Sequence, residues 1–340
     1  MDSVASLPTT NFQTRFAMSH GTTDVSDPWI SSADDWPLDL LLKIKGATRI
    51  AVVIPARNEE RTIGAVIRSI LEELNTFVDE VVVMDSLSSD TTAQVASDEG
   101  AHVYSVGEIR PDLGTWAGKG EALWKSQFVT NADITAFIDA DLTEWGPHFL
   151  RGVIGPLLAD PQVQLCRGFY DRIFDVGGLV TLEGGRVTEL VARPWLTLFR
   201  PELAGIVQPL AGEWAIRNSI LHSLSIPTGY GVEISTLLDV HDGYGVRGIA
   251  QVDLGRRAHR HQNIHDLGAM AIEILAAANR RRLPTAVLAV ESITGLANEE
   301  TPKSEVLLRS MDENRQWAEQ TVRIDERPPF DKVNAAQQHI

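Results

Sequence analysis

Residues 134–141 read ITAFIDAD, a run of apolar side chains that ends in two aspartates, Asp139 and Asp141. A strand that is buried on both faces of a parallel sheet is almost continuously apolar. Ligands of such sheets bind beyond the carboxyl ends of the strands, where these two aspartates would stand. Carboxylate oxygens are hard ligands for a divalent cation, which could in turn hold a diphosphate. The stretch therefore predicts a buried central strand with a metal-binding end.

Two further apolar runs lie at residues 50–54 and 80–84, and the first leads into a polar segment at 55–60, PARNEE. Apolar side chains at helical spacing follow each run, at 58–74, where Asn58 is the expected N-cap, and at about 90–99. Strands that alternate with amphipathic helices indicate a parallel sheet with helices on both faces. We therefore expect an α/β fold with a doubly wound, mostly parallel sheet, and both polar segments at the same edge.

The composition limits the classes of function. Of the 340 residues, 44% are hydrophobic and 22% are charged, as in a globular protein. The single cysteine, Cys166, excludes an intramolecular disulfide and favours a reducing compartment. No apolar run approaches the roughly 20 residues that span a bilayer, and no signal-peptide pattern is present. The net charge of −16 disfavours nucleic acid and anionic membranes as partners. We expect a cytoplasmic protein that associates with neither.

Three segments could contact an anionic ligand. Lys119 stands between two glycines at the start of an expected helix, where it could meet a phosphate or a base edge, or simply be exposed. Arg186 and Thr188 follow a glycine pair and lead into a helix, a combination that suits a phosphate or a carboxylate. Ser86 follows the strand at 80–84 and could bind a ribose or a base, or belong to a helix cap.

Other candidate residues keep two readings at this point. Residues 256–261, RRAHRH, are the strongest basic cluster and could balance a phosphorylated substrate, or form a solvated surface. Within it His259 could complete a metal site with the aspartates, or be structural. Glu213 and Glu233 each stand where a turn leads into a helix. Either could act on a sugar hydroxyl, or only favour the helix dipole.

Eight short blocks then occur in a specific order. They are PARNEE (55–60), DSLSSD (85–90), AGKGEAL (117–123), DAD (139–141), GGRVT (184–188), QPLAGE (208–213), YGVE (230–233) and RAHR (257–260). In this order they resemble the glucosyl-3-phosphoglycerate synthases, a family of retaining glycosyltransferases with the GT-A fold. The resemblance covers roughly residues 45–285.

The resemblance implies a reaction and a set of site residues. The donor would be UDP-glucose, the acceptor D-3-phosphoglycerate, and the product glucosyl-3-phosphoglycerate for glucosylglycerate synthesis. Mg²⁺, with Mn²⁺ or Co²⁺ as substitutes, would be held by Asp141 and His259. The catalytic residues would be Glu233, near the reacting centre, Arg257, facing the diphosphate, and Lys119. The nucleotide sugar would contact Pro55, Ala56, Glu59, Ser86, Lys119, Asp139 and Arg257, and the acceptor Gly185, Arg186, Val187, Thr188 and His261.

Residue patterns and the resemblance together divide the chain into four parts, and the resemblance alone implies a homodimer. Residues 1–45 would form an N-terminal arm with a short helix, 46–165 a nucleotide-sugar-binding half, and 166–290 an acceptor-binding half. Residues 291–340 are polar, and we expect a loosely packed tail.

Three positions depart from the family pattern. Arg57 replaces an apolar residue, Leu87 replaces a glycine, and His261 stands where an asparagine can serve the acceptor. Three alternatives also stay open. A mannosyl-3-phosphoglycerate synthase would use GDP-mannose, a polyprenyl-phosphate sugar transferase shares the first and fourth blocks, and a nucleotide-sugar-binding protein would lack catalysis.

Overall fold

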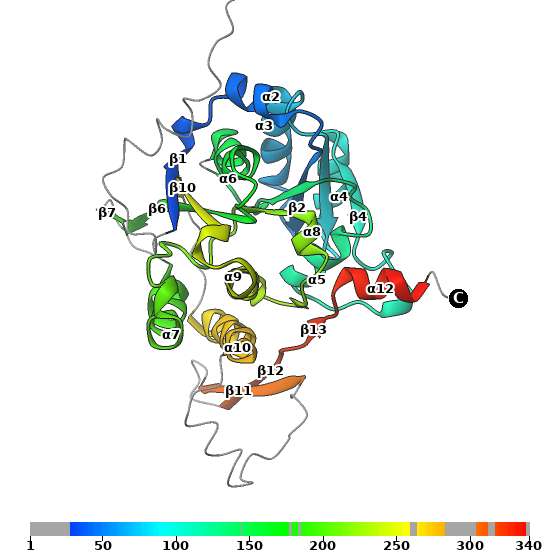
Figure 1. Ribbon diagram of the computed structural model, residues 1–340. Helices are drawn as coiled ribbons and strands as arrows, with labels where there is room; N and C mark the ends of the chain where they lie inside the picture. The colour runs from blue at the N-terminus through cyan, green and yellow to red at the C-terminus, as the bar shows by residue number, and fades with distance from the viewer. Residues whose placement is uncertain are drawn as a thin grey trace, which may run out of the picture.

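The computed structural model describes residues 28–143, 145–176, 179–182, 185–258, 264–282, 304–311 and 317–337 (Figure 1). The predicted residues His259 and His261 lie outside these ranges, and the side chain of Arg257 is not described.

One large sheet organises the described residues. Its order is β1-β10-β6-β8-β5-β2-β3-β4, and β7 pairs with β6 outside this path. Most neighbouring strands run parallel, whereas β8 is antiparallel to both β5 and β6, and β7 is antiparallel to β6. The predicted fold, a mostly parallel mixed sheet, is confirmed. The strands are β1 (Trp29–Ser32), β2 (Ile50–Ala56), β3 (Glu80–Asp85), β4 (His102–Ser105), β5 (Ile134–Phe137), β6 (Leu165–Val176), β7 (Leu179–Leu182), β8 (Trp214–Arg217) and β10 (Ile249–Ala258).

Helices cover both faces of this sheet (Figure 1). In the view of Figure 1, α2 (Leu38–Lys45), α3 (Ile63–Leu74) and α6 (His148–Ala159) lie above the sheet, and α9 (Val232–Tyr244) and α10 (Ile264–Arg280) lie below it. The other helices are α4 (Thr92–Asp98), α5 (Lys119–Ser126), α7 (Arg193–Phe199), α8 (Asn218–Leu221) and α12 (Phe330–Gln337). Single turns are η1 (Ala33–Asp35), η2 (Pro111–Leu113), η3 (Thr188–Ala192), η4 (Pro201–Leu203) and η5 (Val246–Gly248).

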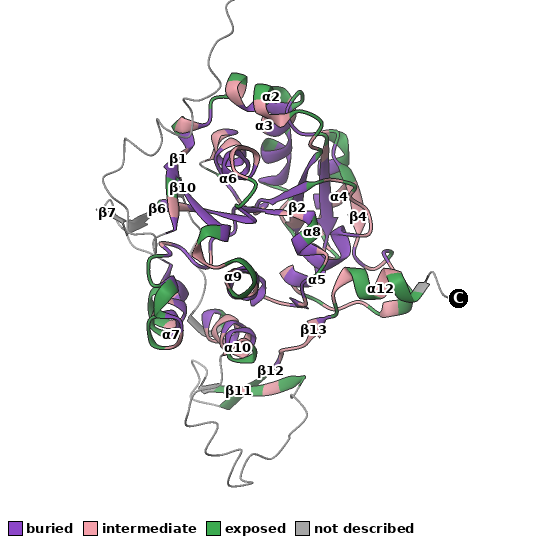
Figure 2. Ribbon diagram, in the orientation of Figure 1, coloured by how far each residue is buried: buried purple, intermediate pink, exposed green. Residues whose placement is uncertain are grey.

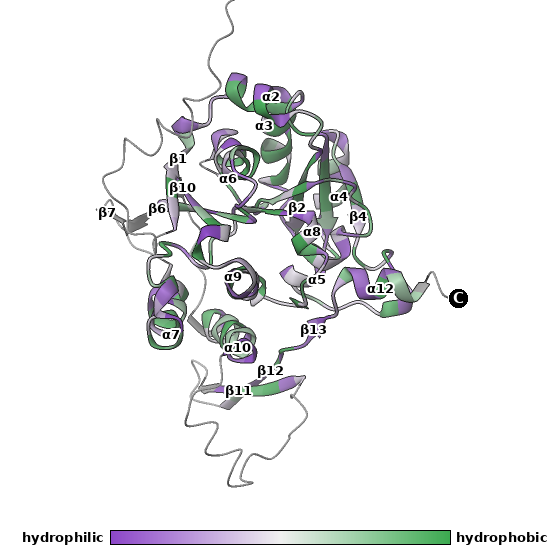
Figure 3. Cartoon of the chain, in the orientation of Figure 1, coloured by the Kyte–Doolittle hydropathy of each residue, from purple (hydrophilic) through white to green (hydrophobic). Residues whose placement is uncertain are grey.

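Alternate residues of the central strands belong to two different cores. In β2, Val52 and Ile54 pack into the cluster under α3 and α6, and Val53 packs into the cluster on the opposite face. This follows from the period of two along a strand. Figure 2 shows the resulting burial of the sheet, and Figure 3 shows hydrophobic residues along its central strands. No helix within the described ranges has the length and apolar character that a membrane crossing requires.

The start of the first predicted helix differs from the expectation. Asn58 adopts a left-handed conformation (φ 58°) and is not an N-cap, since α3 begins only at Ile63. Its side-chain oxygen instead accepts a hydrogen bond from the backbone N–H of Ser89 at 2.8 Å. Asn58 therefore ties together the two loops that follow β2 and β3, which places both at the carboxyl edge of the sheet.

The C-terminal region is more ordered than its polar composition suggested. β11 (Glu305–Met311) and β12 (Trp317–Arg323) pair as antiparallel strands, and β13 (Glu326–Arg327) pairs with β9 (Ile226–Pro227). Arg327 is only 8% exposed, and the ring of Phe330 packs on those of Phe128 and His222. The prediction of a loosely packed tail is therefore wrong for this segment. Arg327 is buried against Glu121, a partner far away in sequence, which composition cannot indicate.

Leu87 has a strained backbone conformation in the loop after β3. It adopts φ 60° with its side chain 56% exposed, at a position where the sequence departs from a glycine. A left-handed conformation costs a non-glycine residue about 1–2 kcal/mol. Leu87→Gly should therefore raise the free energy of unfolding, measured by urea denaturation, by about 0.5–1 kcal/mol after the entropy loss of glycine.

The matched control is Leu42→Gly, which removes a 41% exposed leucine from α2. There glycine should lower the free energy of unfolding by about 1 kcal/mol, as in other exposed helices. Equal losses for both variants would contradict the strain assigned to Leu87.

Candidate active site

A cavity of about 610 Å³ opens at the carboxyl edge of the sheet. Its walls come from the ends of β2, β3 and β5, the start of α5, and the turns that precede η3 and α9. Twelve residues predicted for the site line it: Pro55, Ala56, Glu59, Ser86, Lys119, Asp139, Asp141, Gly185, Arg186, Val187, Thr188 and Glu233. Segments that are far apart in the sequence therefore share one cavity, as the parallel-sheet rule predicts.

Lys119 joins two carboxylates at the centre of this cavity. Its Nζ lies 2.7 Å from Oδ1 of Asp139 and 2.8 Å from Oε1 of Glu233. Burial on its own would lower the pKa of Lys119, but the charges and hydrogen bonds of the two carboxylates outweigh it and raise that pKa above its ordinary value. Lys119 is therefore a cation at neutral pH. It connects the start of α5 to the segment that follows β5 and to the first turn of α9.

Two glycines allow the start of α5 to approach the turn before α9. A Cβ on Gly118 would lie 2.3 Å from the carbonyl oxygen of Thr228, and one on Gly120 would lie 1.7 Å from that of Pro227. In return, the N–H of Gly120 donates to Gly229 O at 3.2 Å, and the N–H of Glu121 donates to Thr228 O at 2.8 Å. The close approach that these two glycines permit is thus made to the protein's own backbone, and it brings Lys119 to Glu233.

Arg167 lies behind Glu233 and was not predicted. Its guanidinium is 1% exposed and donates to the carbonyl oxygen of Glu233, to Thr236 Oγ1 at 2.7 Å and to Ala211 O at 3.3 Å. Burial lowers its pKa to about 10, against the opposing charge of Glu233, so it stays protonated at neutral pH. Arg167 thereby links the first turn of α9 to the loop that contains Gly212.

Gly212 makes room for Asp139. A Cβ at Gly212 would lie 2.2 Å from the Oδ2 atom of Asp139. The carboxylate is therefore enclosed by Lys119 on one side and by this loop on the other. The sequence showed the QPLAGE block without indicating why it needs glycine, because the contact is between segments far apart in the chain.

Glu273 of α10 is a second residue that sequence reasoning missed. Its Oε2 accepts the backbone N–H of Tyr230 at 2.6 Å, and both residues line the cavity. Burial raises the pKa of Glu273, partly offset by this hydrogen bond. Glu273 thus holds the turn that precedes Glu233 from the side of α10.

Four of the acceptor candidates line the same cavity. Gly185, Arg186 and Val187 lead into η3, Thr188 is its first residue, and all four line the cavity. Thr188 is 3% exposed, and Arg186 is partly exposed. A guanidinium beside a helical first turn suits a phosphate or a carboxylate.

The donor chemistry at the β5 end fits a divalent cation. Asp141 lines the cavity two residues after Asp139, whose Oδ1 receives the Lys119 ammonium. Among the described residues no group of three metal-ligating side chains occurs. Asp141 would therefore be one hard oxygen ligand for Mg²⁺, with further ligands from outside the described side chains or from a bound diphosphate.

Comparison with known proteins shows which family this chain resembles. A family model described as glycosyl transferase family 2 matches residues 51–204. The glucosyl-3-phosphoglycerate synthase of Mycobacterium tuberculosis (strain ATCC 25618 / H37Rv) is 45% identical over 245 residues, which are 71% of this chain and 76% of the synthase. The chain belongs to the glucosyl-3-phosphoglycerate synthase family. The synthase of Petrotoga mobilis is 44% identical over 237 residues, 68% of this chain and 73% of its own length.

A solved structure of a family member shows the same architecture. The M. tuberculosis glucosyl-3-phosphoglycerate synthase, in complex with Mn²⁺, UDP-glucose and phosphoglyceric acid, superposes with a TM-score of 0.76 at 38% identity. The superposition covers 90% of this chain and 99% of that structure. The resemblance found from the motifs is therefore confirmed at the level of the family and the fold.

The Lys119 bridge has a measurable effect on stability. Lys119→Met leaves the carboxylates of Asp139 and Glu233, 27% and 6% exposed, side by side without their cation. We expect the free energy of unfolding at pH 7 to fall by about 3 kcal/mol.

The pH dependence of the stability that Lys119 contributes follows from its raised pKa. Because folding raises the pKa of Lys119, its contribution is fully present below the unfolded lysine value of about 10.4 and is lost only above the folded value. In urea unfolding the loss caused by Lys119→Met should therefore be the same at pH 7 and at pH 9. Lys43→Met, at an exposed pair with Asp39, is the control and should change stability by less than about 0.5 kcal/mol. A Lys119→Met protein as stable as this control at pH 7 would contradict the bridge.

Proposed function

We propose that this protein transfers glucose from UDP-glucose to D-3-phosphoglycerate with retention of configuration, and so produces glucosyl-3-phosphoglycerate. The observation that carries the proposal is the single cavity that is lined both by the ion-paired Lys119, Asp139 and Glu233 and by residues 185–188. Two relatives support the proposed reaction. One is a glucosyl-3-phosphoglycerate synthase that is 45% identical, and the other is a similar structure that holds UDP-glucose and phosphoglyceric acid.

The donor would occupy the β2–β3–β5 side of the cavity. Pro55, Ala56, Glu59 and Ser86 line that side and would contact the nucleotide, with Asp139 and Lys119 near the sugar-phosphate linkage. Bound Mg²⁺ would neutralise charge that develops on the diphosphate as it leaves. Asp141 would hold the metal together with His259, and Arg257 would add positive charge from β10.

The acceptor would occupy the opposite side. Arg186 offers a charged fork to the phosphate or carboxylate of phosphoglycerate, and the turn at 185–188 offers backbone N–H groups and the Thr188 hydroxyl. His261 would stand beside the acceptor. Holding the acceptor hydroxyl against the anomeric carbon would supply the proximity that lowers the barrier.

The reaction itself would proceed by attack from the face of the leaving group. The bond from the anomeric carbon to the phosphate oxygen breaks, the bond to the acceptor oxygen forms, and the leaving phosphate takes the acceptor's proton. Glu233 is held by Lys119 at 2.8 Å and is 6% exposed, which disfavours it as a covalent nucleophile. Its role would be to contact glucose, while Lys119 stabilises the transition state electrostatically.

We further propose that the protein acts in the cytoplasm as a homodimer. The first rests on the single cysteine and on the substrates, and the second on the resemblance to the family alone.

The direct test of the function is UDP release with Mg²⁺, UDP-glucose and D-3-phosphoglycerate, beside GDP-glucose and GDP-mannose. Release should require phosphoglycerate and be highest with UDP-glucose. Asp141→Ala should lower the rate by at least about 100-fold, because one metal ligand is lost. Highest release with GDP-mannose would reassign the donor, and release without phosphoglycerate dependence would sink the acceptor assignment.

A second test concerns the acceptor wall. Arg186→Met should raise the KM for phosphoglycerate about 10- to 100-fold, as expected for a lost hydrogen bond to a charged group, and leave the KM for UDP-glucose within about threefold. Arg68→Met removes the same charge from an exposed ion pair on α3 and should change neither constant. An unchanged acceptor KM in Arg186→Met would place the acceptor elsewhere.

A further inference from the structure

A buried ion pair connects the C-terminal region to the helix that contains Lys119. The guanidinium of Arg327, on β13, donates to both carboxylate oxygens of Glu121, each at 2.7 Å. Glu121 is fully buried and Arg327 is 8% exposed. Arg327 lies beyond residues 45–285, the part of the chain whose motifs resemble the family, so no motif gives it a role.

The same guanidinium holds the loop that leads to Lys119. Arg327 donates to the carbonyl oxygens of Leu113 at 2.8 Å and Gly114 at 3.2 Å, and lies over the ring of Trp124 at 4.9 Å. Glu121 stands two residues after Lys119, in the first turn of α5. Arg327 therefore contacts the chain on both sides of Lys119.

Lys125 is a second cation beside Glu121, so Glu121 would stay paired if Arg327 were lost. Its Nζ lies 3.5 Å from Glu121 Oε1 and donates to Val106 O at 2.7 Å and Gly114 O at 2.9 Å. If Arg327 were replaced by an apolar residue, Glu121 would keep a cation beside it. Such a variant is therefore expected to fold.

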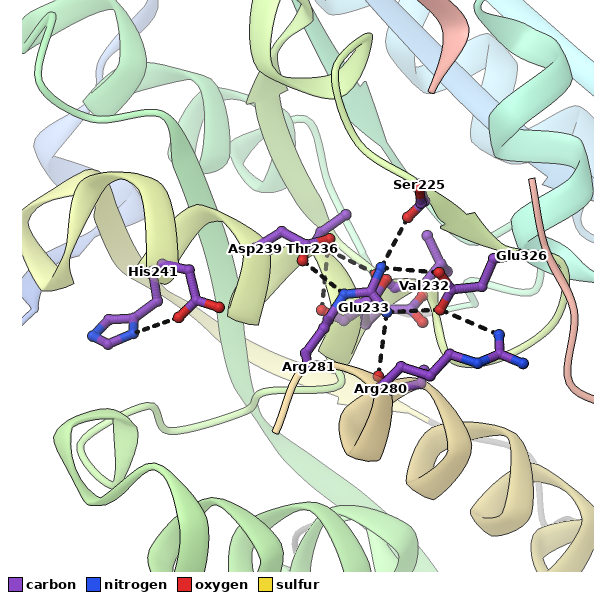
Figure 4. Close-up of polar contacts among 12 residues, drawn as sticks. Ser225, Val232, Glu233, Thr236, Asp239, His241, Arg280, Arg281 and Glu326 are labelled. Atoms are coloured by element: carbon purple, nitrogen blue, oxygen red, sulfur yellow. Dashed lines mark hydrogen bonds and ion pairs between the residues drawn. The ribbon is translucent and has the colours of Figure 1, made fainter. Parts of the chain in front are cut away.

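The neighbouring residue on β13 points to the other side. Glu326 accepts hydrogen bonds from Arg281 at 2.7 and 3.4 Å, and Arg281 in turn contacts Asp239 of α9 at 2.7 Å and Ser225 O at 3.0 Å (Figure 4). Successive side chains of a strand point to opposite faces. β13 thus binds the end of α10 and the middle of α9 through Glu326, and α5 through Arg327.

The backbone of the same segment supports the turn before Glu233. β13 pairs with β9 in an antiparallel register, Glu326 opposite Pro227 and Arg327 opposite Ile226. The N–H of Thr228 then donates to Asp325 O at 3.0 Å, while the carbonyl oxygen of Thr228 accepts from Glu121 N. The turn at 228–231 therefore lies between α5 and the C-terminal segment, and leads directly into Glu233.

We propose that Arg327 is a positioning residue of the active site: through Glu121 and the 113–118 loop it sets the first turn of α5 so that Lys119 reaches Asp139 and Glu233. The proposal rests on the proposed function, because its main effect is on the rate of glucose transfer. A purely stabilising role would instead lower the unfolding temperature and leave the turnover of the folded enzyme unchanged.

The test compares Arg327→Met with Arg200→Met in the full chain. Arg200 is the control, since it is 1% exposed and also binds both carboxylate oxygens of one partner, Asp242, near the far end of α9. Within the described residues it has no direct contact with α5, and its link to β13 runs only through the backbone carbonyl of Arg281. We expect kcat to fall about 10- to 100-fold in Arg327→Met, as for a small displacement of a catalytic group, with a smaller change in KM. Arg200→Met should lose stability but keep kcat within about twofold.

Arg327→Lys gives a graded result. Lysine keeps the charge but not the two-pronged contact, so kcat should lie between those of the wild type and Arg327→Met. If Arg327→Met does not fold, the comparison of Arg327→Lys with Arg200→Lys decides. A kcat within twofold of the wild type for every Arg327 variant that folds would overturn the proposal.

Hydrogen exchange separates this proposal from the proposed function. The amides at 118–122 and 228–231 should exchange faster in Arg327→Met than in Arg200→Met, whatever the substrate proves to be. A wild-type enzyme that transfers no glucose to phosphoglycerate would contradict the function alone. Unchanged exchange in both segments would contradict the positioning role.

Discussion

The ion pairs of Lys119 with Asp139 and Glu233 are the interaction on which the site depends. Three elements far apart in sequence, α5, the end of β5 and α9, meet at one ammonium group. Two carboxylates this close would repel each other without it, and the paired charges also keep the lysine protonated despite its burial. The glycines at 118, 120 and 212 make the meeting possible, because a Cβ at any of them would collide with backbone or with Asp139.

Two buried arginines, Arg167 and Arg327, support the residues around Lys119. Arg167 fixes the backbone of Glu233 from below, and Arg327 fixes the start of α5 from the C-terminal side. Neither guanidinium points to solvent, and both also bind carbonyl oxygens, which satisfies donors that would otherwise be expensive to bury. The charged groups of the cavity are thereby held in position before any ligand binds. Electrostatic stabilisation of a leaving diphosphate requires such preorganisation.

The sequence predicted what local patterns encode. Largely apolar segments at 50–54, 80–84 and 134–138 predicted the central strands, and the polar residues just after them predicted the cavity edge. It did not predict Arg167, Glu273 or Arg327, because their partners are backbone atoms or residues on distant elements, and no spacing signals such contacts. The helix expected from Asn58 begins later for a similar reason, since Asn58 binds Ser89 of the neighbouring loop. The domain boundaries and the individual site roles stay predictions.

The most direct measurement is the structure of the product by NMR. UDP-glucose, D-3-phosphoglycerate and Mg²⁺ would be incubated with the enzyme, and the anomeric configuration and the linkage of any new glucoside assigned. The account predicts one product, glucose joined to the hydroxyl of phosphoglycerate with the α configuration of the donor. A β-linked product would contradict attack from the face of the leaving group, and free glucose alone would contradict transfer to this acceptor.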